Sequence, residues 1–346
     1  MTKKILYVAF VRMPTEKAHG LQIVKTCEAF GCAGFEVTLV VPNRVTPISA
    51  DAFSYYGATH TFKIERESVL DVVRFGYLGF LLSLVWFSER VRMRRDFWDS
   101  IIYSRDALVL WQYILLGRTT VYEAHRAPTF IDRMVSRRAT RVVVITESLR
   151  AAFMRAGVPP ARILVAHDAV DVSPEKMERA ELGLPEGPLV VYAGSRGAGK
   201  GVEVLEQAMP KLTESGISVF LVAGKTPREA RQMLAAADVV VVPNSAKNEQ
   251  YGVHSSPMKL FEALASGARV VASDAPAITE IASEKEAWLF ASDDVEDLIR
   301  KVKESLADPR ALEKVAAAQA LAQRYSWDAR ARTILHALER VNSKVL

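Results

Sequence analysis

The stretch GSRGAGKG, residues 194–201, contains the residue types that hold a phosphate group. Its spacing, G-x-x-x-x-G-K, matches the phosphate-binding loop of nucleotide hydrolases, in which a Ser or Thr after the Lys ligates Mg²⁺. Gly201 stands at that position, which disfavours a hydrolase. A glycine turn between a strand and a helix still lets backbone N–H groups face an anion, with Arg196 and Lys200 adding positive charge. A turn carrying two solvated cations is the simpler alternative.

A second segment, HSSPMKLFEALASG at residues 254–267, predicts a helix whose start could also bind an anion. Ser256 is expected as the N-cap, with Pro257 at the first helical position. Lys259 then lies in the first turn, where a cation is unfavourable by ~0.3–1 kcal/mol unless an anion offsets it. Glu262, on the same face, could accept two hydrogen bonds from a ribose diol. A surface Lys–Glu pair on an ordinary helix remains the alternative.

His125, in VYEAHRAP, follows a predicted strand and could face a ligand at the carboxyl end of a sheet. A histidine packed into a strand–helix turn is the alternative. The sequence shows no convincing pair of carboxylates of the kind that glycoside hydrolases place on either side of the bond they break.

These residues lie on a regular alternation of short apolar strands and helix-length segments, which predicts parallel α/β architecture. Two such series occur, so we expect two doubly wound, Rossmann-like domains that face a cleft. We place an N-terminal domain at 1–173, a linker at 174–188 and a second domain at 189–325. Residues 326–346 predict a C-terminal helix packing back toward the first domain, with Ser326 as its N-cap.

The composition, half apolar and a quarter charged, is that of an ordinary soluble protein. No secretory signal is apparent, and two cysteines without further partners predict a reducing, cytoplasmic compartment. Residues 1–180 hold 25 Lys and Arg against 18 Asp and Glu, a net charge of +7, whereas the remaining residues hold 20 against 22, a net charge of −2. The basic half suits an anionic ligand or the inner face of a membrane, and chance variation in solvated charge is the alternative.

The uncharged stretch FGYLGFLLSLVWF at residues 75–87, followed by SERVRMRR, stands apart from this pattern. It is too short to span a bilayer. A helix buried beside the first sheet is one interpretation, and an apolar, basic-flanked element at a membrane surface is the other.

Several of these segments together resemble the retaining family 4 glycosyltransferases, which have the GT-B fold. The resemblance lies in YAGSRGAGKGVEVLEQA, AADVVVVPNS, SSPMKLFEALASGARVVASDAPAITEI and YSWDARARTIL in the second half. In the first half it lies in RMPTEKAHGLQIVKTCEAFGCAGFEVTLVVP and VVVITESLRAAFMRAGVPPARILVAHDAVD. It covers most of the chain and is weakest over residues 45–100.

The resemblance implies a role for each candidate residue. Arg196 and Lys200 would neutralise the diphosphate of a nucleotide sugar, Lys259 would bind the same group, and Glu262 would hold the ribose. His125 would touch the donor sugar, and we group it with Arg196 and Lys200 as catalytic. The remaining donor-binding candidates are Gly20, Gly194, Ser195, His254, Ser255, Ser256 and Leu260. Lys17 and His19 are candidates for contacts with the acceptor.

The sequence departs from the family at two places. The family carries a pair of glutamates, of which Glu262 is the second, but His254 occupies the position of the first. Glu249 lies nearby and cannot be assumed to replace it. The second departure is length, because the segment between KGVEVLEQAMPKL and AADVVVVPNS has room for one strand–helix unit where the family normally has two.

The resulting hypothesis is a cytoplasmic hexosyltransferase that works with retention and without a metal or other cofactor. It would take a nucleotide-diphosphate sugar as donor and a saccharide or lipid-linked saccharide as acceptor, with an anionic membrane surface as a further candidate partner and no nucleic acid. Two alternatives are a binding or partner-docking protein of the same fold that has lost catalysis, and a sugar-nucleotide epimerase, which needs a base in the cleft.

Overall fold

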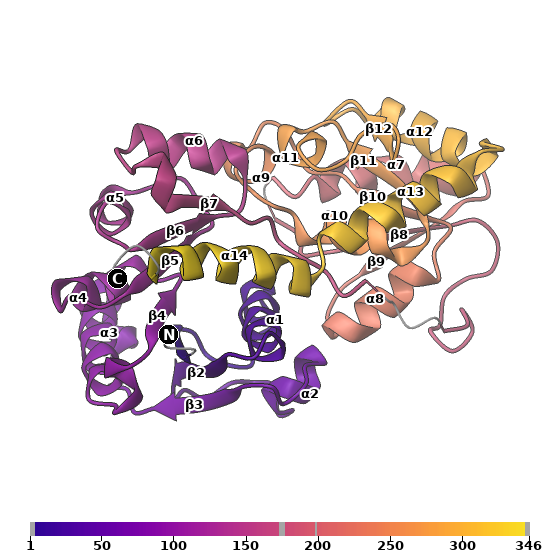
Figure 1. Cartoon of the computed structure of the whole chain (residues 1–346). Coiled ribbons are helices and arrows are strands. Elements are labelled where there is room, and N and C mark those ends of the chain that lie inside the picture. Colours follow the sequence, from indigo (N-terminus) through magenta and orange to yellow (C-terminus); the bar gives the residue numbers. More distant parts are fainter. Residues whose placement is uncertain (1–3, 173–176, 198, 343–346) are drawn as a thin grey trace. The chain divides into compact units, whose positions relative to one another are not determined.

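The computed structural model describes residues 4–172, 177–197 and 199–342 of the chain (Figure 1). The chain forms two compact units. The first comprises Met1–Ala166 and Arg330–Leu346, and the second comprises His167–Ala329. The chain therefore first leaves the first unit after Ala166, and not at residue 173 as predicted. The described residues of the expected linker at 174–188 belong to the second unit.

The sheet of the first unit has seven parallel strands in the order β3-β2-β1-β4-β5-β6-β7. This order changes direction at β1, as in doubly wound folds. Apart from β3, whose sequence KIERE is mostly charged, the strands are short and largely apolar because helices cover both faces of such a sheet. Their bounds are β1 Lys4–Val8, β2 Glu36–Pro42, β3 Lys63–Glu67, β4 Ile101–Ser104, β5 Thr120–Ala124, β6 Arg141–Val144 and β7 Ile163–Val165.

The helices of the first unit connect these strands. α3, α4, α5 and α6 contribute to one apolar cluster with the sheet, whereas Phe30 of α1 packs on Tyr103 at the other face. The helices are α1 Ala18–Cys32, α2 Ala52–Tyr56, α3 Gly76–Arg92, α4 Ala107–Leu115, α5 Phe130–Ser136 and α6 Glu147–Arg155, with short 3₁₀ turns at Val73–Phe75, Asp96–Trp98 and Pro160–Arg162.

The second unit has a five-stranded parallel sheet in the order β12-β11-β10-β8-β9. A single strand–helix unit, β9 followed by α8, lies between α7 and β10, as the length of this segment predicts. The strands are β8 Leu189–Ala193, β9 Ser218–Val222, β10 Val239–Val242, β11 Arg269–Ser273 and β12 Trp288–Phe290. The helices are α7 Val202–Glu214, α8 Pro227–Ala235, α9 Glu249–Gly252, α10 Met258–Ser266, α11 Pro276–Thr279, α12 Val295–Ala307 and α13 Ala311–Arg324.

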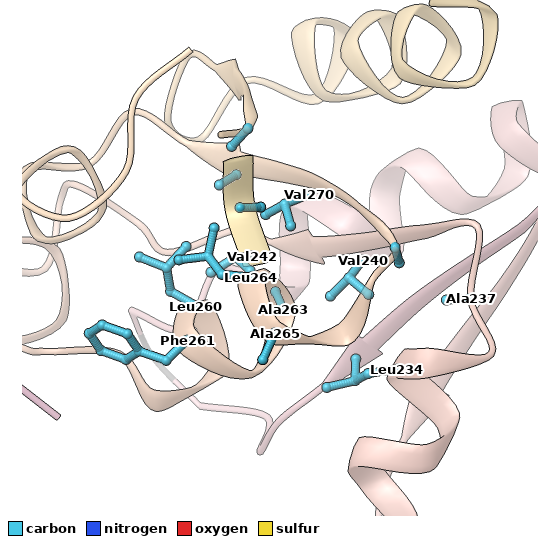
Figure 2. Packing of buried hydrophobic residues seen from close by; sticks show 14 of the residues in the cluster. Leu234, Ala237, Val240, Val242, Leu260, Phe261, Ala263, Leu264, Ala265 and Val270 are labelled. Carbon is cyan, nitrogen blue, oxygen red and sulfur yellow. The ribbon is translucent and has the colours of Figure 1, made fainter. Parts of the chain in front are cut away.

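Two apolar layers hold the helices of the second unit on its sheet. One contains residues of α7 and α12, and the other contains residues of α8, α10 and α13. Figure 2 shows part of the second layer, in which Leu260, Phe261 and Leu264 of α10 lie close to Val242 of β10. This packing fixes α10, and with it Lys259 and Glu262, against the sheet.

The last helix, α14 at Trp327–Asn342, begins as predicted, because the hydroxyl of Ser326 accepts a hydrogen bond from the N–H of Ala329 at 3.3 Å. From Arg330 onward it belongs to the first unit. Its Arg330 is buried beside Glu123 of β5, and the carbonyl of Ala337 accepts a hydrogen bond from Arg141 of β6 at 3.3 Å. The predicted return of the C-terminal helix to the first domain is therefore confirmed.

Both cysteines are free, with Cys27 buried and Cys32 exposed. In the described part of the chain, no helix combines the length and the apolar character needed to cross a membrane. Nor do the described residues gather three or more His, Cys, Asp or Glu side chains where they could bind a metal ion.

Candidate functional site

The glycine loop after β8 follows a path that only glycine permits at two positions. Gly201, the N-cap of α7, has a φ of 70°, and a Cβ there would lie 1.6 Å from the carbonyl oxygen of Pro243. Gly199 has a φ of 82°, and its Cβ would lie 2.6 Å from the side chain of Asn248. The missing side chains let the loop lie directly against the segment that follows β10, at the carboxyl end of the sheet.

This packing brings together Lys200 and Lys259, which belong to different elements. The ammonium group of Lys259 donates a hydrogen bond to the carbonyl oxygen of Lys200 at 3.0 Å. The Lys200 ammonium lies 4.0 Å from the ring centroid of Tyr251, and that of Lys259 lies 5.2 Å from the ring centroid of Tyr192. Aromatic faces attract cations, so the rings hold both ammonium groups in place.

The charge on these lysines lacks direct compensation. Among the described residues, neither lysine forms an ion pair with a carboxylate. Burial, and then the positive charge of Lys200, lowers the pKa of Lys259 to about 7, and burial also lowers the pKa of Lys200. A bound anion would relieve both effects, since it favours the charged form of each group. The pair therefore has the electrostatics of an anion-binding site.

The start of α10 adds to this site, although not as predicted. The helix begins at Met258, so Pro257 is the N-cap and not the first helical residue. Ser256 does not cap the helix, because its hydroxyl accepts a hydrogen bond from the N–H of Asp168 at 2.9 Å instead. Among the described residues no side chain caps α10, which leaves the positive end of its dipole uncompensated. Lys259 lies in the first turn, as predicted.

Glu262 lies one turn beyond Lys259 and is half-buried. Burial raises its pKa to about 7, and the nearby Asp171 adds to the effect while Arg231 opposes it. Arg231 pairs with Asp171 at 3.3 Å. A carboxyl group in this state can accept hydrogen bonds when ionised, and it can also donate one when protonated.

Arg196 is not part of the cluster formed by the two lysines. Its side chain is 71% exposed and pairs with Glu206 of α7 at 3.2 Å. Gly194 and Ser195 precede it at the end of β8, where the carbonyl of Ser195 accepts a hydrogen bond from the hydroxyl of Tyr192 at 3.2 Å. A Cβ at Gly194 would lie 2.7 Å from the same hydroxyl. The structure therefore brings together two of the three cations expected to converge.

The residues before α10 are held by contacts within the second unit. His254 is buried, and its Nε2 lies 3.3 Å from the carboxylate of Glu249. The hydroxyl of Ser255 donates to the carbonyl of Tyr251 at 2.7 Å. Leu260 was predicted to bind the donor, but it is completely buried in the core. Its side chain packs the helix and is not available to a ligand. Glu249, which the sequence could not place, thus touches the histidine at the position of the family's first glutamate.

In the first unit, His125 follows β5 and belongs to a buried charge network. Its Nε2 lies 2.6 Å from the carboxylate of Glu123, and that carboxylate lies 3.0 Å from the guanidinium of Arg330. Burial opposes ionisation of Glu123, but Arg330 and His125 outweigh it and hold the pKa of the carboxyl group well below its usual range. Tyr103 and Gln22 also donate hydrogen bonds to Glu123. The partners of His125 are thus fixed before any substrate binds.

The other candidates of this unit lie at the start of α1. A Cβ at Gly20 would lie 2.1 Å from the hydroxyl oxygen of Tyr56, so this glycine makes room for Tyr56. That hydroxyl binds the backbone of Thr15. Burial, followed by the charges of Arg105 and Lys17, lowers the pKa of His19 to about 4. His19 is therefore neutral at pH 7.

Sequence reasoning missed Glu123, Arg330 and the two tyrosines beside the lysines. Glu123 carried a signal, since it is the single carboxylate in the apolar strand TVYEA, and a buried charge requires a partner. Nothing near it in the sequence pointed to Arg330 as that partner.

Comparison with known proteins identifies the fold. The fold of the whole chain is GT-B, as in the crystal structure of Anabaena Alr3699/HepE in complex with UDP and glucose. That structure is 18% identical, covers 97% of this chain and 99% of its own, and has a TM-score of 0.72. A family model described as "Glycosyl transferase-like" matches residues 203–336. Residues 203–336 thus match a glycosyltransferase-like family, and the chain has the GT-B fold.

Curated relatives match parts of the chain. Sulfoquinovosyl transferase SQD2 of Arabidopsis thaliana is 30% identical over 181 residues, 45% of this chain and 34% of its own length. Phosphatidyl-myo-inositol mannosyltransferase of Propionibacterium freudenreichii is 26% identical over 219 residues, 57% of this chain and 55% of its own length. The chain thus matches between a third and about half of the length of these relatives.

Proposed function

We propose that this protein is a glycosyltransferase that moves a hexose from a nucleotide-diphosphate sugar to an acceptor. The observation that carries the proposal is the contact between Lys259 and Lys200 beside the uncapped start of α10. This contact combines positive charge with the backbone N–H donors of a helix start, which suits a diphosphate. The similar structure that contains UDP and glucose, and the glycosyltransferases among the relatives, support a nucleotide sugar as the ligand.

In the proposed reaction the bond between the anomeric carbon and the diphosphate breaks, with its electron pair going to the diphosphate. The oxygen of an acceptor hydroxyl forms the new bond on the same face of the sugar, and its proton passes to the departing diphosphate. Negative charge grows on the departing diphosphate. Lys200, Lys259 and the N–H groups at the start of α10 would stabilise this charge, as preorganised donors do in other enzymes. In this scheme the cations replace a metal ion, so we propose that the reaction needs neither a metal nor another cofactor. Arg196 would have to leave Glu206 to join them.

We assign binding of the ribose to Glu262 and contact with the donor sugar to His125. The proposed role of His125 is positioning by hydrogen bond or by shape, because its Nε2 is already engaged by Glu123. The acceptor class we propose is a lipid-linked saccharide or another membrane lipid. One relative is named for action on phosphatidyl-myo-inositol, which supports a lipid acceptor.

The test is binding followed by turnover. UDP-glucose and the corresponding GDP and ADP sugars are screened by thermal shift, and release of nucleoside diphosphate is then measured with and without a lipid extract, in the presence of EDTA. We expect stabilisation by one donor and release that depends on the extract. Lys259→Met should abolish the shift, whereas the matched variant Lys285→Met, at an exposed lysine of the same unit, should retain it.

A binding protein without catalytic activity is the second candidate, favoured by the buried His254 at the position of the family's first glutamate. Donor stabilisation without diphosphate release under any acceptor would support it. Stabilisation by ATP and Mg²⁺ alone would contradict both candidates.

A further inference from the structure

Helix α3 in the first unit has two apolar faces, and only one of them is covered. Leu78, Leu82, Val85 and Trp86 are exposed by 73%, 60%, 48% and 50%. Their spacing places them on one side of the helix. The residues of α3 that are buried are Gly79, Ser83, Leu84, Phe87, Ser88 and Val91. A helix at an ordinary protein surface is apolar on its buried face alone and polar on the side exposed to water.

The apolar surface continues at both ends of this stripe. Phe75 and Tyr77 precede it and Met93 follows it, with exposed fractions of 66%, 67% and 68%. We call these three residues and the four of the stripe the α3 face. Of the fifteen large apolar residues that are exposed in the described chain, eleven lie between residues 70 and 116. Such clustering marks an interaction site, because scattered exposed residues would be unremarkable.

Arginines without carboxylate partners flank the α3 face. Arg74 lies next to it, with its guanidinium carbon 5.0 Å from the ring centroid of Phe75, and Arg95 lies beyond its other end. Both are exposed, and neither forms an ion pair within the described residues. Of the five arginines over residues 70–95, Arg90, Arg92 and Arg94 pair with carboxylates, so Arg74 and Arg95 carry the uncompensated positive charge. The surface is therefore apolar along its centre and positive at its ends.

We propose that the α3 face binds the surface of a lipid bilayer that contains anionic lipids, with α3 lying in the plane of the interface. Leucine, valine and aromatic side chains would enter the boundary between headgroups and acyl chains, and Arg74 and Arg95 would contact phosphates. Trp86 is suited to this position, since tryptophan is favoured at membrane interfaces. The proposal goes beyond the proposed function, because binding to a membrane requires neither a donor nor sugar transfer.

The charges favour a membrane over a second copy of the chain. A two-fold interface through the α3 face would place the same surface of both copies together. The arginines of one copy would then meet those of the other, which is unfavourable, whereas an anionic surface complements them.

Flotation with liposomes tests the proposal on the full chain without nucleotide sugar. The vesicles contain either phosphatidylcholine alone or equal parts of phosphatidylcholine and phosphatidylglycerol. We expect the protein to float with the anionic vesicles and far less with the neutral ones. Arg74→Gln/Arg95→Gln should weaken the binding by about 25-fold, since each basic residue near an anionic surface contributes about fivefold.

A triple variant tests the apolar part of the α3 face. Leu78→Glu/Leu82→Glu/Trp86→Glu should reduce vesicle binding by at least about a hundredfold, because burial of one large apolar side chain is worth about tenfold or more. The matched control is Val45→Glu/Met154→Glu/Leu312→Glu, which makes the same change in charge at apolar residues exposed elsewhere. It should bind at a strength close to that of the wild type. Circular dichroism establishes that both variants are folded.

Three results would overturn the proposal. The wild-type protein could stay at the bottom of the gradient with anionic vesicles, or the triple variant could still bind the vesicles. The control variant could also lose as much vesicle binding as the triple variant. Self-association that the triple variant abolishes, without vesicle binding, would instead identify a second copy as the occupant. Vesicle binding without donor binding would leave this inference standing and remove the proposed function.

Discussion

The guanidinium of Arg330 lies 3.0 Å from the carboxylate of Glu123, and both side chains are buried within the first unit. Arg330 belongs to the C-terminal helix α14, whereas Glu123 belongs to the central strand β5. Alternation along β5 directs Glu123 away from Tyr122 and Ala124, toward the face of the sheet that α14 covers (Figure 1). One buried ion pair therefore joins the end of the chain to the residue that holds His125.

Replacing Arg330 with Met should lower the free energy of unfolding by about 3–5 kcal/mol, because it leaves a carboxylate buried without its main counter-charge. Chemical denaturation measures the change. Arg332→Met, at an exposed arginine of the same helix, is the matched control and should change stability by less than about 0.5 kcal/mol. The double variant Glu123→Gln/Arg330→Met should recover much of the loss, since no charge is then left alone. Similar losses in Arg330→Met and the control would show that the pair is not important for stability.

Binding of UDP-glucose should weaken as the pH rises through 7. Burial and Lys200 lower the pKa of Lys259 to about 7, so its ammonium form is dominant only below that pH. Because a bound diphosphate favours the charged form, the affinity should fall by up to tenfold per pH unit above 7. Titration calorimetry in buffers of different ionisation enthalpy measures both the affinity and the proton taken up.

Lys259→Met supplies the control for this pH dependence. Its residual affinity should be low and nearly constant between pH 6 and about 9, because the titrating group has been removed. The variant should also be more stable than the wild type by about 1–3 kcal/mol at pH 6, where the wild type must keep a desolvated charge. A wild-type affinity that does not change with pH would contradict the assignment of Lys259.

Glu262→Gln should stabilise the protein at pH 8 and leave it unchanged below about pH 4. Burial raises the pKa of Glu262 to about 7 from an ordinary value of 4.5, so the folded state binds more protons between these values. Its contribution to the free energy of unfolding therefore falls as the pH rises from 4.5 to 7. We expect a gain of about 1–3 kcal/mol at pH 8, measured by urea denaturation. Glu313→Gln, at an exposed glutamate, should show no such difference.

The same variant tests the proposed role of Glu262 in ribose binding. The wild type should prefer UDP to 2′-deoxy-UDP by about tenfold or more, because a site built around a hydroxyl rejects a ligand without it. Glu262→Gln should lose most of this preference. If the preference were unchanged in the variant, Glu262 would not contact the ribose.

Gly201→Ala should cost at least about 3 kcal/mol of stability. The new Cβ would combine a positive φ with a position 1.6 Å from the Pro243 carbonyl oxygen, so the loop would have to move. Gly216→Ala is the matched control, with a φ of 75° and open space around its Cβ. It should cost only about 1 kcal/mol. Equal losses would show that the loop adapts and that the close approach at Gly201 is not a constraint.

The sequence by itself determined the succession of parallel strands and helices, the single strand–helix unit of the second domain and the cap at Ser326. These features depend on apolar periodicity, turn residues and caps, which are set by residues close together in the sequence. It also placed Lys259 in the first turn of its helix. The sequence was wrong about the cap of that helix, because the hydroxyl of Ser256 binds a partner from a distant segment instead. It was also wrong about Leu260, because packing against the sheet buries that side chain.

Only the tertiary structure decided which charges meet. Lys200 contacts Lys259 because glycine lets two loops touch at one end of a parallel sheet. Glu123 meets Arg330 because the last helix returns to the first unit, and no spacing in the chain indicates such a pairing. The sequence of α3 is apolar on both faces, and the packing of one of them against the core leaves the other exposed. Contacts between distant segments depend on how the elements assemble, which local periodicity does not specify.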